Sequence, residues 1–121
     1  MKESNIRNKS FLFAVRMIKL FQYLSTEKKE YVLSKQLLRS GTAVGAMVRE
    51  AEHAESKADF VHKMAIAQKE INETIYWLEL LAETDYLVKQ EFESLNNDAV
   101  ELIKILSTII TKTKQNLITK P

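Results

Sequence analysis

Two motifs in this chain pair an acidic residue with a histidine at a spacing that metal ligands can have. Glu50-x-x-His53 and Asp59-x-x-His62 each place a carboxylate and an imidazole about one helical turn apart. Di-iron proteins of the four-helix class bind metal with two such motifs and single glutamates from two further helices. Residues 8–25, however, contain no carboxylate, and both motifs flank one junction between predicted helices. The sequence therefore predicts solvated or capped helix ends here, and no metal site.

Covalent catalysis lacks an identifiable nucleophile. The chain contains no cysteine, and neither a glycine-rich phosphate loop nor a G-x-S-x-G elbow occurs in it. Glu70, Glu73 and Glu79 favour an exposed or interfacial acidic stripe over a buried carboxylate pair. We expect a protein that is not an enzyme, with no catalytic residues, no cofactor and no small-molecule substrate.

The charges are segregated along the chain, although the net charge is only +2. Residues 1–49 carry ten Lys or Arg against three Glu, and residues 50–101 carry four Lys against thirteen Asp or Glu. Residues 102–121 carry four Lys and no acidic residue. Such asymmetry indicates a nucleic-acid or membrane partner, or the docking of complementary surfaces.

Three explanations of this segregation are open. Neighbouring helices of one bundle can have complementary charges, or basic and acidic faces of different subunits can meet head to tail in a ring. The basic residues can also form a phosphate-binding surface whose contacts are directed to the nucleic-acid backbone and weakened by salt. The residues of such an RNA-binding surface would be Arg7, Lys9, Arg16, Lys19, Lys35, Arg39, Arg49, Lys112 and Lys114, with Lys120 on the C-terminal tail.

These side chains must be positioned by helices. The chain has two glycines, and its single proline is the last residue, Pro121, so the turns of a sheet-rich fold have no obvious residues to form them. Apolar residues recur with helical spacing in residues 10–24, 30–54, 57–83 and 89–114. Four helices with short connections lie antiparallel to their neighbours. The prediction is an all-α protein with one domain, residues 1–121, folded as an antiparallel up-and-down four-helix bundle.

The first predicted helix is apolar on two faces. Its main stripe comprises Phe11, Ala14, Val15, Ile18 and Phe21, and a second stripe comprises Phe13, Met17, Leu20 and Leu24. One buried stripe is enough for a monomeric bundle, so the surplus apolar surface favours a subunit interface.

The third helix begins with a capping box in which the Ser56 hydroxyl accepts a hydrogen bond from the amide of Asp59 and the Asp59 side chain reaches back to the cap.

Five residues are singled out for close helix packing or for that interface. Gly41 and Gly45 lie four residues apart on one helix face, where each costs about 1 kcal/mol relative to alanine unless a neighbouring helix approaches closely. Ile66, Trp77 and Leu80 lie away from the main stripe of the third helix. Trp77 in particular has the size and amphipathic character common at interfaces.

The apolar stretch that follows the charged N-terminus is interrupted by Arg16 and Lys19, which is unlike a signal peptide or a membrane span. Together with the absence of cysteine, this predicts a soluble, cytoplasmic protein without a membrane partner.

The segment SKQLLRSGTAVGA, residues 34–46, resembles proteins encoded in 23S rRNA intervening sequences. Glu50-Ala51, SKADF at 56–60 and YWLE at 76–79 extend the resemblance, and the accessory variability proteins of diversity-generating retroelements are similar. Gln36, Arg39, Ser40 and Glu50 match polar residues of that family, whereas Ala43 and Met47 replace its common serine and asparagine. The resemblance implies a four-helix bundle that forms a homo-oligomeric ring, typically a pentamer, with a basic surface suited to RNA or a ribonucleoprotein.

Two functions from different classes follow from these observations. The first is a non-enzymatic oligomeric bundle that binds RNA or a ribonucleoprotein through its basic surface. The alternative is a structural or adaptor homo-oligomer that binds a protein partner and has no affinity for nucleic acid.

Overall fold

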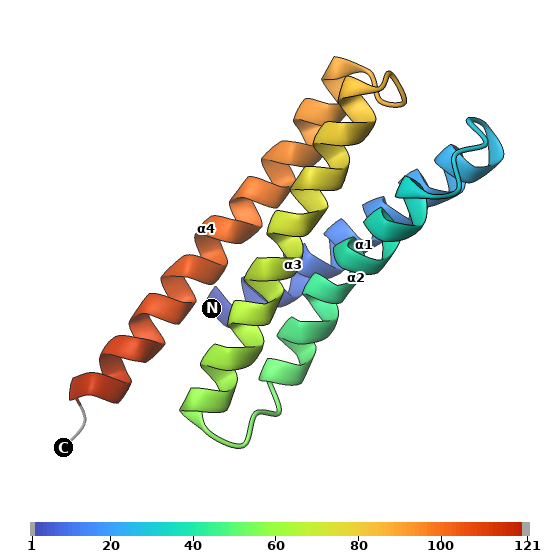
Figure 1. Ribbon diagram of the computed structural model, residues 1–121. Helices are drawn as coiled ribbons and strands as arrows, with labels where there is room; N and C mark the ends of the chain where they lie inside the picture. The colour runs from blue at the N-terminus through green and yellow to red at the C-terminus, as the bar shows by residue number, and fades with distance from the viewer. Residues whose placement is uncertain (1, 120–121) are drawn as a thin grey trace.

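The chain forms four α-helices, described by a computed structural model over residues 2–119, with side chains over residues 5–117. The helices are α1 (Lys2–Thr26), α2 (Leu33–Ala51), α3 (Lys57–Glu83) and α4 (Lys89–Thr119), and successive helices run in opposite directions (Figure 1). No strand occurs within residues 2–119. The predicted all-α antiparallel four-helix bundle is confirmed.

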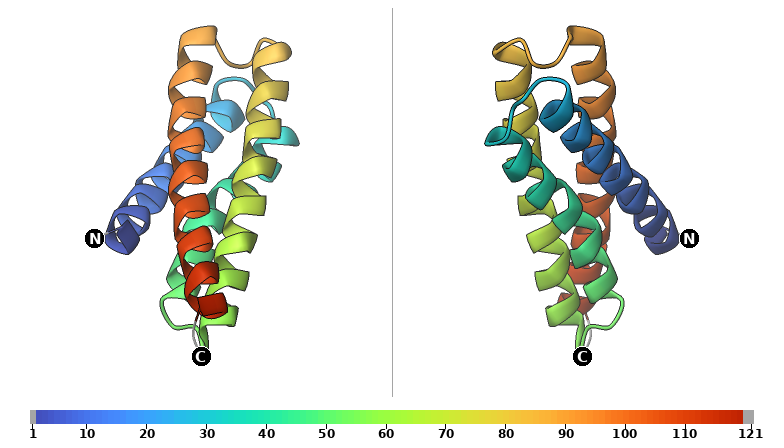
Figure 2. Two further views of the ribbon diagram at one scale, coloured as in Figure 1. Left: turned by 90° about the vertical axis from the view of Figure 1, so that its left-hand side faces the viewer. Right: turned by 90° about the vertical axis from the view of Figure 1, so that its right-hand side faces the viewer.

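The bundle is more open on one side. α1 packs along α2, α2 along α3, and α3 along α4, whereas α1 meets α4 over a shorter stretch. The N-terminal half of α1 leans away from α4, as both views in Figure 2 show. Two hairpins, α1–α2 and α3–α4, therefore meet chiefly through α2 and α3.

α2 is shorter than the predicted range of 30–54 because polar groups end it on both sides. The Glu30 carboxylate accepts hydrogen bonds from the backbone amides of Val32, Leu33 and Ser34 at 2.7–3.2 Å, so Glu30 caps the helix from outside. At the other end, the His53 amide donates to the Glu50 carbonyl and the Ala54 amide to the Ala51 carbonyl. These tighter bonds three residues apart replace the α-helical pattern.

α3 has the predicted bounds, whereas α1 and α4 are longer than predicted. Ile6 explains the earlier start of α1, since this fully buried side chain continues the apolar stripe two turns before residue 13. The capping box of α3 is formed in part as predicted. The Ser56 hydroxyl accepts from the Asp59 amide at 3.0 Å, but the Asp59 carboxylate accepts from Glu55, one residue before the cap, at 3.2 Å.

Of the two apolar stripes of α1, it is the second that enters the core. Phe13, Met17, Leu20 and Leu24 are buried, whereas Phe11 is 53% exposed and Ile18 is 42% exposed. Ala14, Val15 and Phe21, the rest of the expected main stripe, are half-buried. The buried face runs through Ile6 and Ser10 without a charge, and the other stripe is interrupted by Arg7 and Gln22. That interruption is the physical reason for the outcome.

α1 lies directly against both glycines of α2, which continues through them without a break. A Cβ on Gly41 would lie 2.3 Å from Cγ of the buried Met17, and a Cβ on Gly45 would lie 3.3 Å from the Ser10 carbonyl oxygen. The glycines thus permit a close contact between two helices of the same chain.

Candidate interaction surfaces

Ion pairs join the basic helix α1 to the acidic first half of α4. Arg16 Nη1 lies 2.6 Å from Asp98 Oδ2, and Arg16 Nη2 donates to Ser94 Oγ at 3.0 Å. Lys9 Nζ lies 3.1 Å from Glu101 Oε2. At the other side of α1, Arg7 Nε lies 3.0 Å from Glu52 Oε2, just after α2. These three predicted RNA-contact residues are therefore engaged within the chain.

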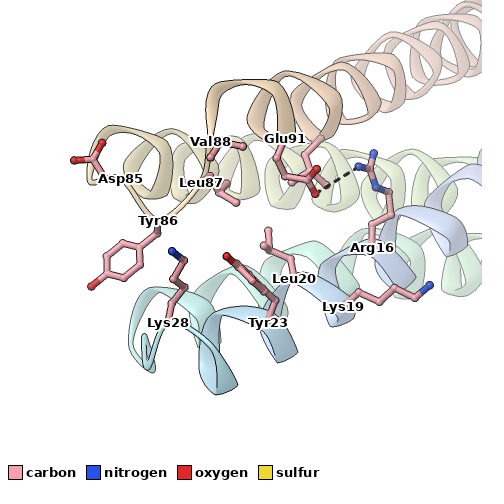
Figure 3. A pocket seen from close by; sticks show the side chains of 11 residues that line it. Arg16, Lys19, Leu20, Tyr23, Lys28, Asp85, Tyr86, Leu87, Val88 and Glu91 are labelled. Carbon is pink, nitrogen blue, oxygen red and sulfur yellow. Dashed lines mark ion pairs between the residues drawn. The ribbon is translucent and has the colours of Figure 1, made fainter.

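A cavity of about 430 Å³ lies between α1 and the α3–α4 connection (Figure 3). We call it the α1–α4 cavity. Its apolar side includes the buried residues Leu20, Leu87 and Leu95. Its polar lining residues come from α1, both connections at this end of the bundle and the start of α4: Arg16, Lys19, Tyr23, Lys28, Asp85, Tyr86 and Glu91. The cavity lies at the end of the bundle where the α1–α2 connection and the C-terminal end of α1 stand apart from the start of α4 (Figure 1).

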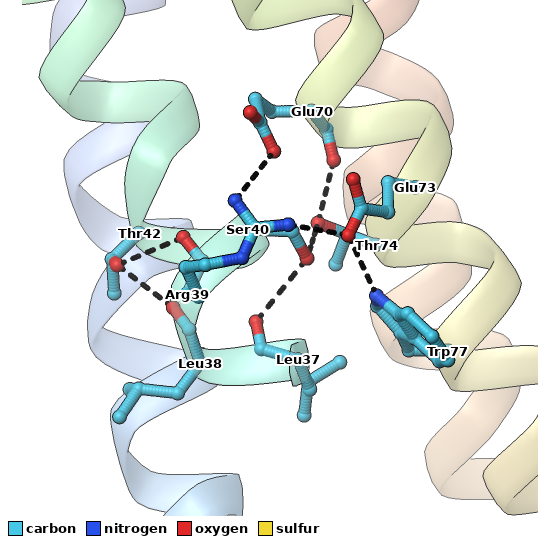
Figure 4. A network of polar contacts seen from close by, with 9 residues as sticks. All are labelled: Leu37, Leu38, Arg39, Ser40, Thr42, Glu70, Glu73, Thr74 and Trp77. Atoms are coloured by element: carbon cyan, nitrogen blue, oxygen red, sulfur yellow. Dashed lines mark hydrogen bonds and ion pairs between the residues drawn. The ribbon is translucent and has the colours of Figure 1, made fainter. Parts of the chain in front are cut away.

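Arg39 of α2 joins a polar network on α3 (Figure 4). Its guanidinium pairs with Glu73 and lies 3.5 Å from Glu70, whose side chain is only 14% exposed. Burial alone would raise the pKa of Glu73, but hydrogen bonds from Trp77 Nε1 and from Arg39 lower that pKa below its ordinary value. The same carboxylate raises the pKa of Arg39. Arg39 is thus a fourth predicted RNA-contact residue whose charge is matched by acidic neighbours.

Beneath this network, a buried pair of hydroxyls links α2 to α3. Thr74 Oγ1 and Ser40 Oγ lie 2.8 Å apart, and both side chains are fully buried. Thr74 also lies 2.8 Å from the Glu70 carbonyl oxygen, and Ser40 lies 3.5 Å from that of Leu37. Ser40 and Arg39, which the family resemblance singled out, therefore serve the contact between α2 and α3.

The other five predicted RNA-contact residues make no ion pair with any residue that the structure describes. Lys19 and Lys35 are exposed near the α1–α2 connection, and Arg49 stacks over Phe11 with its guanidinium carbon 5.5 Å from the ring centroid. Lys112 and Lys114 are exposed at the far end of α4, and Lys120 lies outside the described residues. The structure thus places the unpaired cations in separate groups instead of one continuous stripe.

Two lysines of the α1–α2 connection add to the first group. Lys28 lies with its Nζ 6.0 Å from the centroid of the Tyr23 ring, and Lys29 has a positive φ of 55°. Neither forms an ion pair within residues 5–117. We call Lys19, Lys28, Lys29 and Lys35 the connection cations. Lys28 and Lys29 are not among the predicted RNA-contact residues, although both stand between the first two predicted helices.

The residues predicted for an interface on α3 are half-buried within the chain. Trp77 packs against the core and donates to Glu73, and Ile66 and Leu80 are each partly covered. The larger exposed apolar surface lies on α1. We define the outer face of α1 as Phe11, Val15 and Ile18, with the 61%-exposed Leu12 beside it. In the sequence, the two apolar stripes of the first predicted helix indicated this exposed surface.

The end of the bundle that carries the two histidine motifs is mostly exposed. His53 and His62 are exposed, and Asp59 is engaged in capping α3. Glu50 pairs with Lys63 at 3.2 Å. Over the part of the chain that the structure describes, no three His, Asp or Glu side chains come together as metal ligands would.

None of the helices within residues 2–119 contains a stretch long and apolar enough to cross a bilayer.

Comparison with known proteins finds a matching family model and similar solved structures. The family model described as 23S rRNA-intervening sequence protein matches residues 2–108. A crystal structure of a protein of unknown function from the S23 ribosomal protein family of Bacteroides thetaiotaomicron VPI-5482 is 53% identical in sequence. The match covers 92% of this chain and 99% of that one, with a TM-score of 0.91. No curated protein matches the sequence. The resemblance seen in residues 34–46 extends over nearly the whole chain, which belongs to the 23S rRNA-intervening sequence protein family.

Proposed function

We propose that this chain is a non-enzymatic, homo-oligomeric bundle that binds RNA or a ribonucleoprotein through the connection cations. The observation that carries this proposal is that Lys19, Lys28, Lys29 and Lys35 are all exposed and make no ion pair with a described residue. Cations without intramolecular partners are available to phosphates, and their binding releases counterions from RNA. The name of the family supports a ribosomal RNA context for this activity, which belongs to the cytoplasm.

Binding of this kind would depend little on the nucleotide sequence of the RNA. The connection cations are lysines on flexible stems, and lysine contacts phosphate as a point charge without the planar fork of arginine. Contacts to phosphates position a protein on a nucleic acid, whereas contacts to base edges give specificity. We therefore expect affinity that falls steeply with salt and varies modestly with RNA sequence.

The outer face of α1 supports the oligomeric part of the proposal. Phe11 and Ile18 are 53% and 42% exposed, and Leu12 beside them is 61% exposed. Grouped apolar side chains on one helix face are typical of protein–protein interfaces. A ring of five subunits would place this face between neighbouring copies and keep the connection cations outside it.

A non-catalytic role is supported by the engagement of the polar side chains. Arg16, Arg39 and Glu73 are all engaged in contacts between helices, and Asp59 caps α3. These groups stabilise the packing of one helix on another, which is a structural use of charge.

The alternative function is an adaptor oligomer without affinity for nucleic acid. It is favoured by the ion pairs of Arg7, Lys9, Arg16 and Arg39, since four of the nine predicted RNA-contact residues are matched by carboxylates of the same chain. In that case the charge segregation would serve assembly of the bundle alone.

Native mass spectrometry of the purified protein, with and without a structured RNA, separates the two functions. We expect an oligomer, most simply a pentamer, that gains RNA at low ammonium acetate concentration and loses it as the salt rises. The same oligomer without RNA at every salt concentration would replace the proposed function with the adaptor function. A monomer at micromolar concentration would contradict the oligomeric part of both.

A further inference from the structure

The α1–α4 cavity combines an apolar floor with aromatic and cationic side chains at its edge (Figure 3). Leu20, Leu87 and Leu95 are at most 7% exposed and form the floor. Tyr23 and Tyr86 flank the opening from α1 and from the α3–α4 connection. A volume of about 430 Å³ falls within the usual range for pockets that hold small organic groups.

The cations of the cavity are placed at its two ends. Lys28 lies at one end with its Nζ directed into the opening beside the Tyr23 hydroxyl, whereas Lys19 lies at the other end along α1 with its Nζ directed away from the opening (Figure 3). Neither lysine has a carboxylate partner within residues 5–117.

Neither acidic lining residue faces Lys28 in the opening. Glu91 Oε1 lies 4.0 Å from Arg16 Nη2. The Asp85 carboxylate points away from Lys28. Lys28 is therefore the unpaired cation whose ammonium is directed into the opening.

We propose that the α1–α4 cavity holds one unpaired nucleotide of an RNA chain. The base lies over the leucine floor against Tyr23, Tyr86 and the exposed Val88, and a phosphate next to that nucleotide meets Lys28. Aromatic rings next to flexible cations are the usual means of holding unstacked bases, because every base has a face that stacks. A base in a duplex is stacked and paired and does not enter the cavity. This inference rests on the proposed RNA binding and names the part of the RNA that is bound.

Fluorescence anisotropy with a labelled short oligouridylate tests the cavity directly. Tyr23→Leu removes the ring from a side chain that is 44% exposed, so the fold is retained, and we expect about tenfold weaker binding. Tyr23→Phe keeps the ring and should bind within about twofold of the unaltered protein. Tyr76→Leu is the matched control, because Tyr76 is 54% exposed and does not line the cavity. Lys28→Gln should weaken binding and flatten its salt dependence.

A second measurement locates the base. Photo-crosslinking with an oligonucleotide that contains 4-thiouridine, followed by peptide mapping, should give crosslinks at Tyr23 or Tyr86. Unlabelled oligouridylate should compete well, and a blunt RNA duplex or uridine monophosphate should compete poorly.

The outcomes separate the two proposals. RNA binding that is unchanged by Tyr23→Leu, with crosslinks elsewhere, overturns the cavity inference and leaves RNA binding standing. Equal competition by the duplex overturns it as well. Equal competition by uridine monophosphate makes the cavity a site for free nucleotides instead of RNA. Absence of any RNA binding by the unaltered protein contradicts both proposals.

Discussion

Glu30 shows how one side chain outside a helix determines where that helix begins. Burial alone would raise the pKa of Glu30, but hydrogen bonds from the amides of Leu33, Ser34 and Val32 lower it below the ordinary 4.5. Because the pKa is lower in the folded than in the unfolded state, the carboxylate stabilises the fold above about pH 4.5. That stabilisation is lost as the pH falls through the folded-state value.

Replacing Glu30 with glutamine should lower the free energy of unfolding by about 1–2 kcal/mol at pH 7, as the loss of a charged cap does. The difference from the unaltered protein should shrink as the pH falls below about 4.5, where the unfolded carboxyl is protonated. Urea unfolding followed by circular dichroism measures both effects. Glu27→Gln, an exposed acid in the same connection, is the control and should change little. A difference that persists unchanged into acid would argue against capping by the carboxylate.

Gly41 and Met17 form the tightest contact between α1 and α2. Gly41→Ala should destabilise the protein by about 1–3 kcal/mol, because the new Cβ would lie 2.3 Å from Met17 Cγ, and improved helix propensity offsets only about 1 kcal/mol. Gly45→Ala, against the Ser10 carbonyl oxygen at 3.3 Å, should be close to neutral.

A double-mutant cycle tests this contact. The cost of Gly41→Ala should largely disappear in a Met17→Ala background, since Met17 Cγ and Sδ are then absent. Equal costs in both backgrounds, measured by denaturant unfolding, would show that the two residues do not compete for space.

The sequence could identify candidate cations but not their partners. Arg16 and Lys19 stand three residues apart in one basic helix, and both are among the predicted RNA-contact residues. Arg16, however, pairs with Asp98, which is 82 residues away in the chain. Only the helix packing brings these two charges together, so local spacing could not distinguish the paired arginine from the unpaired lysine.

At the scale of the helix, α1 has two apolar faces, one buried in the core and one exposed. Phe13 is 1% exposed, and its replacement by alanine should cost about 3–5 kcal/mol. Phe11→Ser with Ile18→Ser changes exposed positions, so the fold should lose little stability as a monomer, but the oligomer should dissociate.

Size-exclusion chromatography with light scattering and thermal unfolding distinguish these variants. The outer-face variant should have a smaller mass and retain its helical circular dichroism. An unchanged mass would remove the outer face of α1 from the subunit interface and return attention to the α3 surface at Ile66 and Leu80.

Helix number, order and direction could be predicted because each helix has an apolar stripe and the connections are short. The buried face of α1 could not be assigned from the sequence, since two apolar stripes occur within residues 11–24. The buried stripe continues back to Ile6 without a charged residue, and this distinguishes it from the other stripe. Ile6 lies before the predicted start of the helix, so the prediction did not include it. The α1–α4 cavity was not predictable, because it depends on how far apart the C-terminal end of α1 and the start of α4 lie, and these segments are distant in the chain.

At the scale of the whole molecule, the charge segregation joins helices within the chain and leaves some lysines unpaired. Basic α1 and α2 are held to acidic partners by the pairs of Arg7, Lys9, Arg16 and Arg39, most of them on partly exposed side chains. Exposed pairs of this kind each contribute on the order of 0–1 kcal/mol, so they orient the helices more than they stabilise them. The connection cations are left over from this pairing, and the proposed function depends on them.

The most direct test of this account is the salt dependence of RNA binding in single lysine-to-glutamine variants. Each of Lys19→Gln and Lys35→Gln should weaken binding to a single-stranded RNA and reduce the slope of log K against log salt by about 0.7. Lys9→Gln is the matched control, because Lys9 is paired with Glu101, and its slope should equal that of the unaltered protein. If all three variants have the slope of the unaltered protein, or if the unaltered protein binds no RNA at low salt, the connection cations do not bind RNA and the central claim is wrong.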